Sequence, residues 1–126
     1  MYKKTVVIVA MCLSALVIQG CQTTTSGSIL KKDPEKAVKV RTQMAAEYIR
    51  SGDLDAAKRA LDQALETDSR DATANMMMGV LLQQEGSQIS LDKADRYFSR
   101  AISLESDNAQ ARNNYGTYLF QAKRYN

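Results

Sequence analysis

Small residues recur along the chain at the spacing of a repeated structural unit. Ala45 and Gly79 are 34 residues apart, and Gly79 and Gly116 are 37 apart. Ala57 and Ala94, each near the start of the next apolar segment, are also 37 apart. Large apolar residues follow at the i, i+3 and i+4 positions of packed helix faces. They are Tyr48, Leu61, Leu65, Met78, Leu82, Phe98, Ile102, Tyr115 and Leu119. This pattern predicts successive pairs of packed helices.

The period and the placement of small residues are typical of the tetratricopeptide repeat, whose signature is W-x2-L-G-x2-Y…A-x3-F…P. The first copy aligns with Arg41, Met44, Ala45, Tyr48, Ala57, Leu61 and Ser69. The Trp and Pro of the signature are absent, but the period and the large and small positions agree over two and a half copies. The sequence therefore predicts an all-α tetratricopeptide-repeat solenoid, with repeats at about 38–71 and 72–108 and an incomplete one at 109–126.

The second copy is three residues longer than the first. Positions up to Leu82 lie 34 residues after their counterparts in the first copy, whereas positions from Ala94 onward lie 37 residues after theirs. The additional residues therefore fall between Leu82 and Ala94. We expect the insertion to lengthen the turn around residues 86–90, since surface loops accept added length at little cost.

Helix boundaries are marked by residues with specific backbone preferences. Asp33 is a candidate N-cap and Pro34 occupies the first turn, where its missing N–H is not needed. Gly52 is expected to end the first helix of the first repeat and Asp53 to cap the second. The repeat domain is therefore predicted to begin at residue 33 and to include residues 33–126.

The third copy stops where its second helix is expected to begin. Four of the eight aromatic residues, Tyr115, Tyr118, Phe120 and Tyr125, lie in the last twelve positions. Solenoids usually need about three repeats and a polar end cap. We therefore expect the chain to be an N-terminal fragment or a truncated product of a longer repeat protein. The alternative is that the last helix acts as its own cap.

The first twenty residues have the pattern of an export signal. Residues 1–4 include two lysines, and residues 5–18 form an apolar run interrupted only by Ser14. Fourteen helical residues extend roughly 21 Å, less than the ~30 Å hydrocarbon core of a bilayer. We expect residues 1–20 to be a cleaved signal peptide.

The end of this segment, Ile18-Gln19-Gly20-Cys21, resembles the lipobox of bacterial lipoproteins. A disulfide between Cys12 and Cys21 is the alternative, but Cys12 lies inside the segment expected to be removed. The resemblance implies a diacylglycerol on the sulfur of Cys21 and an amide-linked acyl chain on its nitrogen. Residues 21–32 then form a lipidated polar tether. The residue after the cysteine is Gln22 and not aspartate. In the lipoproteins that this segment resembles, the absence of aspartate there implies sorting to the outer membrane.

Composition excludes most catalytic chemistry. The chain has no histidine, so the usual triads and the commonest metal ligand are absent. The formal charge is +3, and Lys3 and Lys4 belong to the expected signal peptide. A nearly neutral repeat domain does not favour nucleic-acid binding. We expect no enzymatic activity, no small-molecule substrate, no cofactor and no metal.

Met76-Met77-Met78 is the one candidate metal motif, since thioethers bind soft metals. Consecutive helical residues point in three different directions and cannot converge on one ion. We therefore expect these methionines to pack in the core and on the binding face.

Three short motifs are similar to those of the type IV pilus biogenesis lipoproteins of the PilF/PilW kind. They are Gly20-Cys21, Leu54-Asp55-Ala56-Ala57 and Asn113-Asn114-Tyr115-Gly116. Members of this family are pilotins, outer-membrane lipoproteins that help the pilus secretin to reach the outer membrane and to form its pore. The resemblance implies a scaffold, lipid-anchored in the outer membrane and facing the periplasm, whose partner is the secretin or another pilus-assembly protein. The alternative is a general periplasmic adaptor that regulates a cell-wall hydrolase or a protease.

In a solenoid of this type, one stripe of each first helix lines a concave groove that binds a partner segment. Helical phase assigns Ile49, Arg50, Met76, Val80, Gln83, Asn113, Thr117 and Phe120 to this partner-binding groove. Gln84 and Gln121 lie on the same stripes. The alternative interpretation is that half of these positions are ordinary solvated surface.

Overall fold

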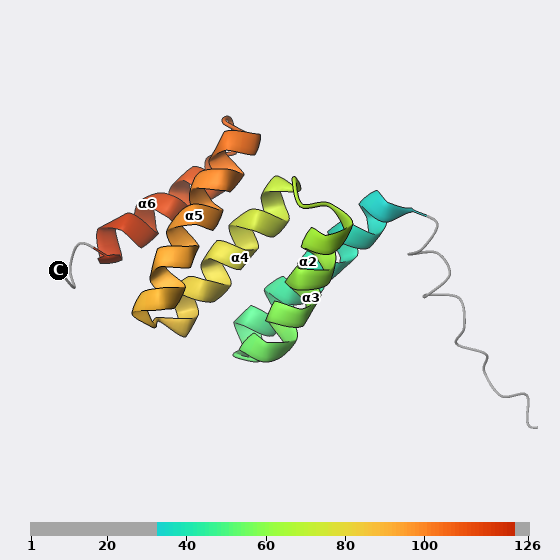
Figure 1. Cartoon of the computed structure of the whole chain (residues 1–126), viewed down its shortest axis with the longest axis horizontal. Coiled ribbons are helices and arrows are strands. Elements are labelled where there is room, and N and C mark those ends of the chain that lie inside the picture. The colour runs from blue at the N-terminus through green and yellow to red at the C-terminus, as the bar shows by residue number, and fades with distance from the viewer. Residues whose placement is uncertain (1–32, 123–126) are drawn as a thin grey trace, which may run out of the picture.

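The computed structural model describes residues 33–122, which form five helices (Figure 1). The helices are α2 (Pro34–Ser51), α3 (Leu54–Thr67), α4 (Ala72–Glu85), α5 (Gln88–Leu104) and α6 (Ala109–Ala122). The predicted signal peptide, Cys21 and the tether lie outside the described residues. Within residues 33–122, no helix has both the length and the apolar character needed to cross a bilayer.

The helices form a stack of antiparallel hairpins (Figure 1). Helices α2 and α3 form the first hairpin and α4 and α5 the second, and these are the two most extensive helix pairings. Helix α4 also contacts α2 and α3, and α6 packs against α4 and α5. The predicted all-α tetratricopeptide-repeat fold is confirmed.

Short polar side chains begin each helix, because they satisfy N–H groups that have no partner inside the first turn. The carboxylate of Asp33 accepts from the Lys36 N–H at 3.0 Å, and that of Asp53 accepts from the Ala56 N–H at 3.0 Å. Asp71, Ser87 and Asn108 do the same for α4, α5 and α6. Gly52 ends α2 with a φ of 82°, in the left-handed region that favours glycine. The expected roles of Asp33, Gly52 and Asp53 are all observed.

The three additional residues of the second repeat lie in a helix and not in a longer turn. Two residues, Gly52 and Asp53, separate α2 from α3, and two residues, Gly86 and Ser87, separate α4 from α5. Helix α5 has 17 residues against 14 for α3. Ser87 caps the added turn, and the Ser90 hydroxyl donates to Glu85 at 2.8 Å. The expectation of a longer turn was wrong, because these polar side chains stabilise an extra helical turn instead.

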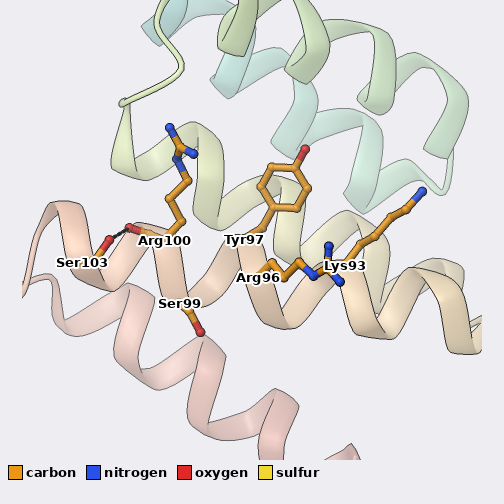
Figure 2. A pocket seen from close by; sticks show the side chains of 6 residues that line it. All are labelled: Lys93, Arg96, Tyr97, Ser99, Arg100 and Ser103. Atoms are coloured by element: carbon orange, nitrogen blue, oxygen red, sulfur yellow. Dashed lines mark hydrogen bonds between the residues drawn. The ribbon is translucent and has the colours of Figure 1, made fainter.

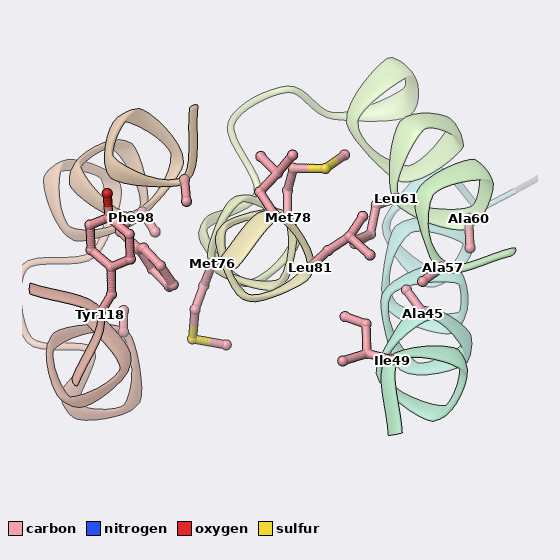
Figure 3. Close-up of a cluster of buried hydrophobic side chains, with 14 residues drawn as sticks. Ala45, Ile49, Ala57, Ala60, Leu61, Met76, Met78, Leu81, Phe98 and Tyr118 are labelled. Atoms are coloured by element: carbon pink, nitrogen blue, oxygen red, sulfur yellow. The ribbon is translucent and has the colours of Figure 1, made fainter. Parts of the chain in front are cut away.

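The core is built from small residues that admit large ones from the neighbouring helix (Figure 3). Ala45, Ala57 and Ala94 have no exposed surface. Leu61 and Phe98 are also fully buried. A Cβ atom on Gly79 would lie 2.9 Å from the ring of Phe98, so only glycine leaves room for this ring. The predicted close approach is confirmed at Gly79 and at the buried alanines. It was wrong for Gly116, which is exposed and has no atom of another helix within 4 Å of its Cβ position.

The three consecutive methionines point in different directions, as helical geometry requires. Met76 and Met78 are 1% and 2% exposed and leave α4 in opposite directions (Figure 3). Met77 is half-buried against the same core. The three thioethers therefore pack separately in the core. Residues 33–122 contain no group of three or more Cys, Asp or Glu side chains placed to hold a metal ion.

Asn75, 34 residues after Arg41, occupies the tryptophan position of the repeat signature and has a different structural role. It is 1% exposed, and its side-chain amide donates to the carbonyl oxygens of Ser69 at 3.1 Å and Asp71 at 2.7 Å. These bonds join the start of α4 to the turn that precedes it. At this position the apolar contacts of a tryptophan ring are therefore replaced by two hydrogen bonds from a buried amide.

Candidate functional site

The candidate binding surface is formed by α2, α4 and α6, the first helices of the three copies. Helix α4 packs between α2 and α6, which brings the predicted stripes of the three helices next to one another. We call the surface that they share the first-helix face. It carries the residues that the sequence assigned to the partner-binding groove.

Two predicted apolar anchors of this set are core side chains. Ile49 of α2 is 8% exposed and Met76 of α4 is 1% exposed, and both belong to the main hydrophobic cluster (Figure 3). They are buried because α4 packs against both α2 and α6. A partner can contact neither side chain without a shift of these helices, so we take Ile49 and Met76 to support the face from below. Val80 is half-buried and Phe120 is 60% exposed, so the apolar surface of the set comes from these two.

The polar members of the set lie on the surface, each with a local partner. Arg50 is exposed and pairs with Glu47, with 2.6 Å between Nη1 and Oε2. The Thr117 hydroxyl donates to the carbonyl oxygen of Asn113 on the same helix at 3.0 Å. Both Asn113 and Thr117 are exposed. The side-chain amide of Asn113 and the lone pairs of the Thr117 hydroxyl oxygen are therefore accessible to a partner.

Glutamines connect the three helices of the face. The Gln83 amide donates to the side-chain oxygen of Gln121 at 2.5 Å, which joins α4 to α6. The Gln84 amide lies 3.5 Å from the carbonyl oxygen of Ile49, which joins α4 to α2. These contacts join α4 to both neighbouring first helices. The face therefore presents hydrogen-bond donors and acceptors on a fixed frame.

A hollow of about 480 Å³ lies beside this face, where α4, α5 and α6 meet. Its lining combines amide and apolar side chains, and only Gln83 belongs to the predicted set. The lining residues are Gln83, Gly86, Gln88, Leu91, Tyr118, Gln121 and Ala122. No local sequence pattern assigns Gln88, Leu91 or Tyr118 to a site, because these residues come together only when α5 packs against α6.

Tyr118 is a buried residue of this hollow whose hydroxyl is hydrogen-bonded. It is 6% exposed, and its hydroxyl donates to the carbonyl oxygen of Leu91 at 2.7 Å. Burial raises the pKa of this hydroxyl, and the nearby carboxylates of Asp95 and Asp92 raise it further. Tyr118 therefore stays protonated and keeps donating to α5 throughout the neutral pH range.

Part of the aromatic group near the end of the chain is buried. The rings of Phe98, Tyr115 and Tyr118 lie 5.5–6.1 Å apart, as the distances between ring centroids show. The Tyr115 hydroxyl also donates to Asp95 at 2.9 Å. In contrast, Leu119 and Phe120 are 38% and 60% exposed. Of the aromatic group, Tyr115 and Tyr118 thus fix α6 to α5 and Phe120 remains at the surface, whereas Tyr125 lies outside the described residues.

The chain is similar to known proteins in both sequence and fold. A sequence profile of the tetratricopeptide repeat matches residues 42–88. The type IV pilus assembly protein PilF of Pseudomonas aeruginosa is 33% identical over 115 residues, which cover 90% of this chain and 44% of PilF. An uncharacterized protein of Haemophilus influenzae is 25% identical over 109 residues, which cover 86% of this chain and 58% of that protein. The chain thus spans about half the length of these relatives.

The similarity to PilF extends to three dimensions. A solved structure of Pseudomonas aeruginosa PilF matches this chain with a TM-score of 0.67 at 33% sequence identity. The match covers 73% of this chain and 40% of the PilF chain. Similar sequence and similar helix arrangement therefore coincide over most of the described residues.

Proposed function

Because the chain is a tetratricopeptide-repeat protein homologous to the pilus assembly protein PilF, we propose that it is a protein-binding scaffold in type IV pilus biogenesis. Its proposed task is to assist the localisation and assembly of the pilus secretin. The observation that carries the proposal is the 33% identity to PilF over 90% of the chain. The mechanism is binding without catalysis, which agrees with a surface made of amides, hydroxyls and apolar groups.

The first-helix face is the proposed docking surface for the partner. Val80 and Phe120 supply apolar contact, and Asn113 and Thr117 supply hydrogen bonds to the backbone of an extended or helical segment. The bonds between helices that Gln83 and Gln84 make keep this surface in place before binding. A surface that is already ordered loses less conformational entropy when the partner docks.

A double substitution on α6 tests the docking surface. Asn113→Arg combined with Thr117→Arg places two long cations on the exposed part of the face, where neither side chain is buried. We expect the level of secretin multimers in the outer membrane to fall by about tenfold, which corresponds to ~1.4 kcal/mol of lost docking energy. The measurement is immunoblotting of detergent-resistant secretin multimers, together with counts of surface pili.

The matched control is Gln63→Arg, which adds one cation at an exposed position of α3, away from the first-helix face. This variant is expected to leave multimers and pili unchanged. Both proteins must also have the wild-type melting temperature by circular dichroism. If deletion of the whole gene left secretin multimers and pili at wild-type levels, the proposed role in pilus assembly would be wrong.

We also propose that Cys21 anchors the protein in the outer membrane, on the periplasmic side. The support is the sequence Ile18-Gln19-Gly20-Cys21 after an apolar run and before a polar tether. Cys21→Ser removes the sulfur that would carry the diacylglycerol, and multiple acyl chains are what make such anchoring stable. We expect the protein to move from the membrane fraction to the soluble periplasmic fraction, as measured by fractionation and immunoblotting. Retention of the Cys21→Ser protein in the outer membrane would contradict the anchor, and Cys12→Ser serves as its control.

A further inference from the structure

The outward side of α5 carries three cations that line one hollow (Figure 2). Lys93, Arg96 and Arg100 are all exposed and follow one another at helical spacings of three and four residues. Together with Tyr97, Ser99 and Ser103 they line a hollow of about 710 Å³. The hollow lies on a second helix of the solenoid and shares no residue with the first-helix face.

The three cations have no counter-ion within residues 33–122. The ion pairs in this part of the chain join Arg50 to Glu47 and Lys58 to Asp62. Lys93, Arg96 and Arg100 make none. Arginine and lysine at a surface are usually solvated, but a group of three around a hollow concentrates positive potential there.

The carboxylates of α5 are engaged elsewhere. Asp92 accepts from the side-chain amide of Gln88 at 3.0 Å, and Asp95 accepts from the Tyr115 hydroxyl of α6 at 2.9 Å. Figure 2 shows Lys93, Tyr97 and Arg100 extending to one side of α5, whereas Ser99 points towards α6. The negative charge of Asp95 therefore lies on the side of α5 that packs against α6, whereas the three cations lie around the hollow.

The first repeat shows that the fold does not require these cations. Thirty-seven residues earlier on α3, the positions of Lys93, Arg96 and Arg100 hold Ala56, Arg59 and Gln63. The position of Tyr97 holds Ala60. Both helices pack extensively against the first helix of their repeat. Two of the three cations thus have no counterpart in the first repeat, so the packing of a second helix does not by itself require the basic group.

We propose that this hollow binds an acidic segment, rich in Asp or Glu, of a partner protein. Lys93 and Arg100 are seven residues apart, or about 10 Å along the helix. Carboxylates spaced by two helical turns match this distance. On an extended strand, carboxylates two or four residues apart share one face and lie about 7 or 13 Å apart, which brackets this distance. The two guanidinium groups can each bind a carboxylate through two N–H groups, and the Tyr97 hydroxyl adds a donor.

The charge of the whole repeat body favours a short acidic segment over a membrane or a nucleic acid. Residues 33–122 contain 11 Lys and Arg against 14 Asp and Glu, a net charge of −3. A flat anionic bilayer or a long polyanion would face this net negative charge. A short segment inside the hollow interacts mainly with the three cations, because other charges are screened beyond about 8 Å at physiological salt.

The test uses the full chain, purified in detergent, and a fluorescein-labelled hexaglutamate peptide as the probe. Fluorescence anisotropy at 50 mM NaCl is expected to show saturable binding that 500 mM NaCl abolishes, and hexalysine is expected not to bind. Arg96→Glu combined with Arg100→Glu is expected to weaken binding by about tenfold or more, because each change replaces an attraction with a repulsion.

Arg59→Glu is the matched control, since it makes the same charge change at the equivalent exposed position of α3. We expect it to change the affinity by less than about twofold. Circular dichroism must show wild-type unfolding for each variant, and Arg96→Gln with Arg100→Gln replaces the double reversal if that protein does not fold. Absence of hexaglutamate binding, or an equal loss with Arg59→Glu, would overturn the proposal. Binding of vesicles made of phosphatidylglycerol and phosphatidylcholine, but not of the peptide, would show a lipid surface as the ligand instead.

Discussion

Replacement of Phe98 by alanine is expected to lower the free energy of unfolding by about 3–5 kcal/mol, the usual cost of truncating a buried aromatic residue. Phe98 is fully buried and its ring rests on Gly79 of α4. The same ring pairs with Tyr115 and Tyr118 of α6, at centroid distances of 5.8 and 5.5 Å. One side chain of α5 therefore holds two neighbouring helices, and its loss loosens both contacts.

The size of this effect matters relative to the total stability. For the 90 residues at 33–122, a total of roughly 5–13 kcal/mol is expected, at 0.05–0.15 kcal/mol per residue. The Phe98→Ala protein should therefore be close to unfolded in mild urea. Urea denaturation of the full chain, followed by circular dichroism, measures the change.

Phe120→Ala is the matched control for Phe98→Ala. The residue type is the same, but Phe120 is 60% exposed, so its truncation is expected to cost less than about 1 kcal/mol. Similar losses for both variants would contradict the central position of Phe98. A fall in the slope of the urea transition for Phe98→Ala alone would mean that α6 separates from the other helices before they unfold.

Gly79→Leu is expected to destabilise the protein by about 3 kcal/mol, at the upper end of the usual cost of overpacking a core. A Cβ atom at this position would already lie 2.9 Å from two ring carbons of Phe98. A leucine side chain extends further into the same space. Because Phe98 is fully buried, its ring cannot move aside without displacing α5 from α4.

Gly116→Leu gives the opposite result at the equivalent position of the third copy. No atom of another helix lies within 4 Å of the place where a Cβ on Gly116 would be. Leucine has a higher helix propensity than glycine, so a gain of up to about 1 kcal/mol is expected. Thermal and urea unfolding of the two variants measure the difference. Destabilisation by Gly116→Leu equal to that by Gly79→Leu would show that another segment covers Gly116.

This contrast has a structural cause. Helix α5 covers Gly79, and no described helix covers the corresponding side of α6, where Gly116 and Leu119 are exposed. A glycine on an exposed helix surface costs stability without giving a close contact in return. Its presence fits the repeat pattern, in which a second helix packs at this position.

Several features could be predicted because they depend only on nearby residues. Asp33, Gly52 and Asp53 act at helix ends through hydrogen bonds and backbone angles within a few residues. The small positions Ala45, Ala57 and Ala94 followed from the repeat period and are fully buried. The exposed positions of Asn113 and Thr117 followed from helical phase.

Other features depended on which helices become neighbours. Ile49 and Met76 have the phase of a surface stripe, but packing between the first helices buries them. The hydroxyl of Tyr118 bonds to Leu91, 27 residues away, which no local pattern indicates. The carboxylate of Asp95 is bonded to the Tyr115 hydroxyl of α6, 20 residues away, and not to the cations of α5.

The sequence by itself determined the number of helices in residues 33–122, the helix ends at Asp33, Gly52 and Asp53, and the close approach of the helices at the buried alanines and Gly79. These properties are local or periodic, so each is encoded within a few residues or within one repeat. The tertiary structure alone decided which stripe residues remain accessible, how the inserted residues are used and which charges lack a partner. Those outcomes depend on the distances between side chains of different helices, and only the packed arrangement sets these distances.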